Sequence, residues 1–121
     1  MATPEKYIDS FVMPVAKAQI DDYKQFAEKM AAIAKKHGAI AYVNCLADDV
    51  KPGKETSFPQ AVKLRSDEIV VSSWAVYPSR ADRDRANQAI MADEAFKQLA
   101  QNIPVDMQRM FSGGFKVLRG L

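Results

Sequence analysis

The chain has 121 residues and a mass of 13.5 kDa, the size of one domain, so residues 1–121 are expected to form a single domain. Hydrophobic residues make up 48% and charged residues 26%, which excludes wholesale disorder and a fibrous repeat. The formal net charge of +2 is too small to indicate a nucleic-acid-binding protein by composition alone.

The sequence also bears on the compartment. It holds no run of the ~20 apolar residues that a transmembrane helix needs, and its first fifteen residues lack the features of a secretory signal peptide. Cys45 is the single cysteine, so an intrachain disulfide is impossible. These observations predict a cytoplasmic protein.

The first part of the chain predicts two strands around a helix. Residues 7–15 are apolar on both parities, which is typical of a strand buried on both faces. A helix is expected over residues 17–37, and Gly38 suits its end. A second strand is expected over residues 40–47. The apolar side chains of the helix recur at steps of three and four: Ile20, Tyr23, Phe26, Ala27, Met30, Ile33 and Ala34.

A long connection follows, over residues 50–67. Its length exceeds the ~12–15 residues beyond which structureless loops become uncommon. A short helical start is expected at residues 57–59. We therefore expect this connection to be ordered and packed through Phe58 and Val62.

The last part of the chain predicts a strand, a helical region and a final strand. Residues 68–77 form the third strand, and Ser79 followed by Asp82 is a helix-capping signal. The remaining elements are a helix ending near Ala92, a last helical piece capped by Asp93 and reaching Gln101, and a fourth strand over residues 109–118.

The order β-α-β-β-α-β predicts an α+β, ferredoxin-like antiparallel sheet with both helices on one face and the first and third strands central. Two helices cover only one face. The other face would then show either Val70, Trp74 and Val76 or the alternate residues of the same strand. An apolar sheet of that size is rarely left wet in a monomer. A homodimer that packs sheet against sheet is the leading expectation.

Five segments resemble, in order, a bacterial family of small proteins known as domain of unknown function 1428 (DUF1428). The segments are YIDSFVMPV, HGAIAYVNCLADDV, TSFPQAVKL, WAVYPSRADRDRAN and MFSGGFKVL, and they extend from Tyr7 to Leu118. The resemblance implies the dimeric α+β barrel fold, in which two ferredoxin-like subunits close their sheets around a shared interior. It implies no particular activity.

Proteins with this barrel more broadly include cofactor-free monooxygenases, haem-degrading enzymes, lactone isomerases and stress-response proteins. They share a cavity between the sheet and the helices or between subunits. Because function resides in a site rather than in a fold, the resemblance carries no chemistry to this chain by itself. We expect neither a cofactor nor a metal.

Asp9 is the first candidate for a functional residue. It lies inside a strand placed at the centre of the sheet, where an unpaired carboxylate is costly to bury. It could act as a base of raised pKa or anchor a polar group of a ligand. It could equally be hydrated near the start of the strand, or paired with an arginine such as Arg109.

Tyr42, Asn44 and Trp74 are the other candidate ligand-binding residues. Tyr42 and Asn44 share a parity on the second strand, and Trp74 is the lone tryptophan. A phenol, an amide and an indole around one cavity would suit an aromatic or quinone-like molecule. Alternatively, Trp74 fills the core or the dimer interface.

The remaining chemistry-bearing residues have structural interpretations. His37 suits a helix C-terminus, Cys45 reads as a buried inert thiol, and no metal-ligand spacing is present. Gly113 and Gly114 read as a close backbone approach that would leave room for a ligand. The charges of residues 80–85 alternate in sign, as on a solvated helix face.

Three functions remain open from the sequence. The first is a small-molecule-binding barrel, in its catalytic form a cofactor-free oxygenase or isomerase acting on an aromatic metabolite. The second is a non-catalytic binding or structural dimer. The third, an RNA-associated module, has the right fold but lacks the aromatic signature of RNA-recognition modules.

Overall fold

The computed structural model describes residues 5–121. Its sheet has the strand order β2-β3-β1-β4 with antiparallel neighbours, so the first and third strands are central, as predicted. The elements are β1 (Tyr7–Ala16), a 3-10 turn (Lys17–Gln19), α1 (Ile20–Lys36), β2 (Ala41–Leu46), α2 (Phe58–Ala61), β3 (Glu68–Tyr77), α3 (Arg80–Ala92), α4 (Glu94–Leu99), a 3-10 turn (Ala100–Asn102) and β4 (Phe111–Lys116).

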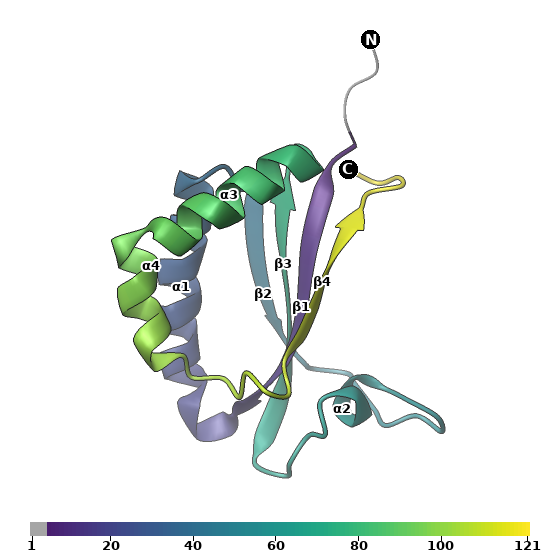
Figure 1. The fold of residues 1–121 in the computed structure, drawn as a ribbon. Helices are drawn as coiled ribbons and strands as arrows, with labels where there is room; N and C mark the ends of the chain where they lie inside the picture. The colour runs from purple at the N-terminus through teal and green to yellow at the C-terminus, as the bar shows by residue number, and fades with distance from the viewer. Residues whose placement is uncertain (1–4) are drawn as a thin grey trace.

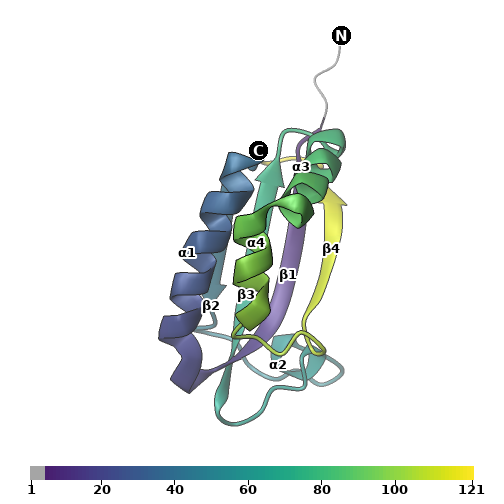
Figure 2. The same cartoon turned by 60° about the vertical axis from the view of Figure 1, so that its left-hand side comes forward.

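The helices α1, α3 and α4 form one layer against one face of the sheet (Figure 1). We call this the helix face and the opposite side the open face. Figure 2 shows α1 and α4 in front of β2, β3 and β1, while β4 lies at the edge of the layer. The predicted α+β, ferredoxin-like arrangement is confirmed.

Local sequence explains where the helices begin and end. The Ser79 hydroxyl accepts a hydrogen bond from the Asp82 backbone N–H at 3.1 Å, which caps α3. The Asp93 carboxylate accepts one from the Ala95 N–H at 2.9 Å, which caps α4. Gly38, at φ +116°, follows the C-cap of α1 in a conformation that only glycine adopts cheaply.

The register assigns alternate side chains to the two faces. Asp9 lies opposite Ala75, and Ala75 lies opposite Tyr42, so these three side chains share the helix face. Ser10 lies opposite Trp74, and Trp74 lies opposite Val43, on the open face. The other side chains that the pairing places on the open face are Ile8, Val12, Pro14, Ala16, Ala41, Cys45, Glu68, Val70, Ser72, Val76, Phe111 and Phe115.

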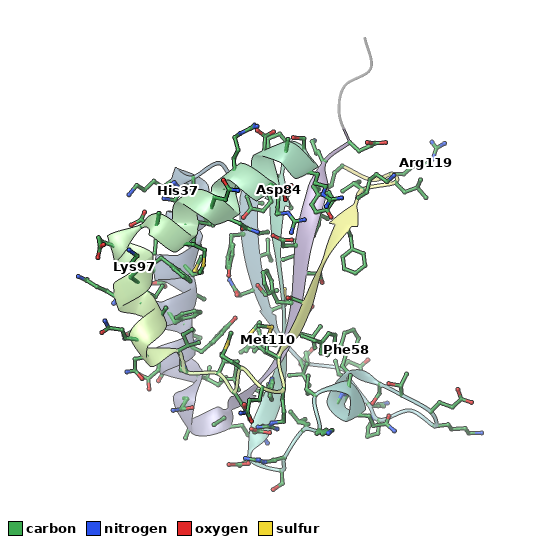
Figure 3. The ribbon with its side chains drawn as sticks, viewed as in Figure 1. His37, Phe58, Asp84, Lys97, Met110 and Arg119 are labelled. Carbon is green, nitrogen blue, oxygen red and sulfur yellow. The ribbon has the colours of Figure 1, made fainter. Side chains whose placement is uncertain are left out.

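The connection over residues 50–67 covers one end of the open face. Val62, just after α2, is fully buried and packs in a cluster with Val12 and Val70. The prediction that this connection packs through Val62 is confirmed, but Phe58 is 50% exposed and is not buried within the chain. Because α2 is a single turn, it meets the sheet mainly through its C-terminal end. In Figure 3, Phe58 lies on the side of the sheet opposite Met110.

Candidate functional site

A cavity of about 470 Å³ lies between the helix face and the helices. This volume falls within the ~300–1,000 Å³ range of small-molecule sites. Most of its wall is apolar, and Met110 lies on this side of the sheet (Figure 3). Every methionine of the sequence other than Met1 lines it: Met13, Met30, Met91, Met107 and Met110. Methionine side chains adapt readily to ligands of different shape.

Aromatic side chains supply much of the remaining wall. Phe11 projects from β1, and Tyr42 and Tyr77 project from β2 and β3. The helices and the segment before β4 close the cavity. Their lining residues include Tyr23, Phe26, Ile90, Phe96, Ile103 and Val105.

A buried ion pair supplies the charges of the cavity. The Asp9 residue is only 7% exposed, and its side chain points from β1 toward α3. The Arg83 Nη1 of α3 donates a hydrogen bond to Asp9 Oδ1 at 3.0 Å. A carboxylate and a guanidinium therefore lie together at the edge of an apolar space.

Arg83 has further partners. Its Nη2 donates to the Tyr7 hydroxyl oxygen at 3.3 Å, and its Cζ lies 4.7 Å from the centroid of the Tyr7 ring. Its Nε is 2.9 Å from Asp84 Oδ1, an ion-pair contact without hydrogen-bond geometry. The guanidinium is thus supported from β1 and from its own helix while it holds Asp9.

The surroundings of Asp9 raise its pKa above that of an exposed aspartate. Burial raises the pKa of Asp9, and this outweighs the Arg83 charge and an Asn87 hydrogen bond, which lower it. The nearby Asp84 charge adds to the increase in pKa. Asp9 therefore holds a proton more readily than an exposed aspartate, a property useful in a general base or in a hydrogen-bonding anchor.

The tyrosines around the cavity are neutral hydrogen-bonding groups. Burial raises the pKa of Tyr42 to about 12. Burial, and then the Asp9 charge, raise the pKa of Tyr77. Their hydroxyls can donate to a ligand without gaining charge near physiological pH.

The four candidate ligand-binding residues do not meet at one place. Asp9 and Tyr42 line the same cavity. Asn44 accepts a hydrogen bond from the Tyr23 hydroxyl at 2.7 Å and lines a neighbouring groove with Tyr42. Trp74 lies on the open face, because it is one residue removed from Ala75 and a strand alternates at every residue. The expectation that Trp74 stacks on a ligand of Asp9 is therefore wrong.

The partner of Asp9 is Arg83, whereas the sequence reasoning suggested Arg109. Arg109 instead donates to both oxygens of Glu68, at 2.7 and 2.6 Å, and to Asp106 at 2.8 Å. Arg83 was overlooked because it belongs to the alternating-sign segment interpreted as a solvated face. Within that segment Arg83 faces the sheet, and its side chain is 17% exposed.

His37 and Cys45 lie outside the cavity lining. The His37 Nε2 hydrogen-bonds Asp93 Oδ2 at 2.7 Å and so ties the C-terminus of α1 to the start of α4. Cys45 is only partly buried, on the open face. This differs from the predicted buried thiol, because β2 is an edge strand and α1, α3 and α4 cover the other face of the sheet (Figure 1).

Residues 5–121 contain no cluster of three histidine, cysteine or acidic side chains placed to hold a metal ion. None of the helices in this range combines the length and apolar character required to cross a bilayer.

Comparison with solved structures shows where this fold recurs. A single-residue variant of SnoaB, a cofactor-independent oxygenase from Streptomyces nogalater, superposes with a TM-score of 0.63 at 14% identity, over 97% of each chain. A NIPSNAP family protein from Agrobacterium tumefaciens superposes with a TM-score of 0.60 at 10% identity, over 97% of this chain and 90% of its own. At these identities the likeness concerns the fold alone.

Sequence comparison identifies closer relatives. YbaA of Escherichia coli K12 is 44% identical over 111 residues, which are 92% of this chain and 95% of YbaA. YbaA of Shigella flexneri matches equally well. Residues 6–107 match the family described as "Protein of unknown function (DUF1428)". The chain belongs to the DUF1428 family.

Proposed function

We propose that this protein binds an uncharged, largely apolar small molecule that carries a hydroxyl group, in the cavity between the helix face and the helices. The observation that supports this most is the Asp9–Arg83 pair at the edge of an apolar wall. An apolar pocket with a few convergent polar groups is the general form of a small-molecule site.

The charges of the pair favour an uncharged ligand. Asp9 would repel an anionic ligand, and Arg83 would repel a cationic ligand. A ligand that approaches one of these groups also approaches the other, because Arg83 Nη1 and Asp9 Oδ1 are 3.0 Å apart. A hydroxyl can donate a hydrogen bond to the Asp9 carboxylate while its oxygen accepts one from a guanidinium N–H. The aromatic and methionine side chains of the wall favour a flat ring system as the remainder of the ligand.

In its catalytic form, the site would act as a cofactor-free oxygenase or isomerase on an aromatic metabolite. Asp9 would accept the proton of a phenol or enol, for which its raised pKa is suited. Arg83 would stabilise the oxyanion that results. The fold shared with SnoaB, described as a cofactor-independent oxygenase, agrees with this chemistry without assigning it.

The open face supports the homodimer as a part of this proposal. Phe111 and Phe115 of β4 are 45% and 59% exposed there. The strand residues on this face are uncharged except Glu68, whose carboxylate is paired with Arg109, so the face offers a second copy little like-charge repulsion. A two-fold arrangement would bring the same patch together from both chains. The absence of basic side chains from those positions also disfavours the RNA-associated alternative.

The alternative to a small-molecule site is a structural or binding dimer in which the Asp9–Arg83 pair only holds α3 to the sheet. The test uses protein labelled with ¹³C at the methionine methyl groups, since five methionines line the cavity. Three probes of similar shape are titrated: 2-naphthol, 2-naphthoate and the cation 2-naphthylmethylammonium. We expect 2-naphthol to shift several methyl resonances and to bind at least about tenfold more tightly than the two ions.

Two results would contradict the proposal. Equal affinity for the three probes would remove the charge argument. Methionine resonances unmoved by all three probes would leave the structural dimer as the better description. Oxygen uptake or a new product with bound 2-naphthol would distinguish the catalytic form from simple binding.

A further inference from the structure

Gly114 lies directly opposite Asp9 in the pairing of β1 with β4. Its backbone is outside the left-handed region, so the backbone conformation does not require glycine here. The lack of space for a side chain does require it. A Cβ atom at this position would stand 2.6 Å from the Tyr7 hydroxyl oxygen and 2.7 Å from its Cε2. The Tyr7 ring therefore occupies the volume that any other side chain at position 114 would need.

The Tyr7 ring also contacts Arg83. The guanidinium lies 4.7 Å from the ring centroid, and its Nη2 donates to the Tyr7 hydroxyl oxygen at 3.3 Å. Such a cation–π contact is stronger where the cation is shielded from water, and the Arg83 side chain is 17% exposed. Gly114, Tyr7, Arg83 and Asp9 thus form a continuous series of contacts from β4 to the cavity.

We propose that Gly114 and Tyr7 are positioning residues that hold the Arg83 guanidinium against the Asp9 carboxylate. A larger side chain at position 114 would displace the Tyr7 ring, because the clashing atoms are at the free end of that side chain. The strand pairing of the sheet would be kept. The Tyr7 ring would no longer hold the Arg83 guanidinium in place, and the distance between that guanidinium and the Asp9 carboxylate would increase. The proposal rests on the proposed function only where it concerns ligand binding.

The ionisation of Asp9 reports this positioning directly. The groups that act on it are Arg83, Asp84 and Asn87 of α3 and Tyr77 of β3. Of these four, Arg83 alone is a cation, so a displaced guanidinium leaves burial and Asp84 to dominate. The pKa of Asp9 must then rise further.

The experiment measures the Asp9 carboxyl carbon by NMR as the pH is changed, in Gly114→Ala, Tyr7→Ala and the double variant. Gly113→Ala is the matched control, since its added Cβ lies 3.5 Å from the Phe115 ring, an ordinary contact, and is opposite Ser10 rather than Asp9. We expect G114A and Y7A each to raise the pKa of Asp9 by about 0.5 or more. G113A should leave it within about 0.2 of the wild type, a shift that corresponds to little change in interaction.

The double variant decides whether Gly114 acts through Tyr7. If it does, adding G114A to Y7A causes no further change. An unchanged Asp9 pKa in Y7A, or an equal G114A effect with and without Tyr7, would overturn the proposal. Should G114A fail to fold, Y7A decides alone because it keeps the glycine. The titration uses no ligand, so failure of 2-naphthol to bind would count against the proposed function and not against this positioning.

Discussion

The two faces of one sheet differ sharply, although the same strands build both. On the helix face, β1 contributes Asp9 and β3 contributes Tyr77 to a cavity with a charged pair. On the open face, the neighbouring residues Ile8 and Val76 are apolar and lie opposite each other. A shift of one residue along a strand therefore separates a ligand-sized cavity with a charged pair at its edge from a largely apolar surface.

The difference follows from what covers each face. Helices leave space where their axes diverge from the sheet, and a carboxylate buried in such a space needs a partner such as Arg83. An apolar face that is covered only at one end favours contact with another apolar face. The helix face therefore suits chemistry and the open face suits assembly.

The largest expected effect is on assembly, from Phe115→Glu. This change places a charge on the open face at a side chain that is 59% exposed in the single chain. We expect the dimer dissociation constant to rise about 100-fold or more, because a charge would be buried without a partner. Sedimentation velocity over a range of concentrations measures this.

Ser112→Glu on the same strand is the control, because Ser112 projects from the opposite face of the sheet. It should leave the dimer intact. A wild-type protein that sediments as a monomer at micromolar concentration would contradict the assembly of the open faces.

The next largest effect concerns the α2 connection, which covers one end of the open face. Val62→Ala should lower the free energy of unfolding by about 2 kcal/mol, because Val62 is fully buried among Val12 and Val70. Phe58→Ala should cost about 1 kcal/mol or less in the single chain, where Phe58 is half exposed. Urea unfolding at low and high protein concentration measures both. A cost for F58A that grows with concentration would mean that a partner buries this ring.

On the helix face, Asp9→Asn should weaken 2-naphthol binding at least about tenfold while the free energy of unfolding changes by about 1 kcal/mol or less. The stability change is small because the cost of burying the carboxylate and the attraction of Arg83 oppose each other. Calorimetric titration and urea unfolding give the two quantities. A large loss of stability with unchanged binding would mark a purely structural pair.

The same variant has a defined pH dependence. Because the folded pKa of Asp9 lies above its unfolded value near 3.8, the folded state binds the proton more tightly. The wild type should therefore lose stability relative to D9N as the pH rises from the unfolded value through the folded one. A difference that grows as the pH falls would have the wrong sign.

The smallest effect is expected away from both faces, from Asp93→Asn. Hydrogen bonds from His37 and Lys36 hold the pKa of Asp93 well below its usual range. Its contribution to stability is therefore present above the unfolded pKa and is lost as the pH falls through the folded pKa. The melting temperature of the wild type should exceed that of D93N by a few degrees at most near neutral pH. The gap should close in acid, and thermal unfolding monitored by circular dichroism is the measurement.

Periodicity predicted the elements and their order because the hydrophobic pattern determines both. Alternation along β1 puts Asp9, Phe11 and Met13 on one side, and all three line the cavity. Alternation alone does not say which side faces the helices, so Trp74 was grouped with residues of the other face. Which side of a strand faces the helices depends on how the helices pack, and the sequence of a single strand does not contain this information.

Long-range pairing accounts for the other differences. Arg83 and Asp9 are 74 residues apart, and nothing local distinguishes Arg83 from the exposed Arg80 and Arg85 beside it. Arg109 was an equally reasonable partner for Asp9 until the fold placed it beside Glu68. Similarly, Val62 and Phe58 are both apolar, and only the depth of α2 against the sheet separates the buried one from the exposed one.

The α2 connection constrains the geometry of any pairing of two chains. By covering Val12 and Val70 it thickens one end of the open face (Figure 1). The part that remains uncovered includes Trp74, Ile8, Val76 and Phe115. A sheet-to-sheet pairing would therefore use the end of the open face at which β1 begins. The α2 connection of each chain would then limit how far one sheet can slide along the other.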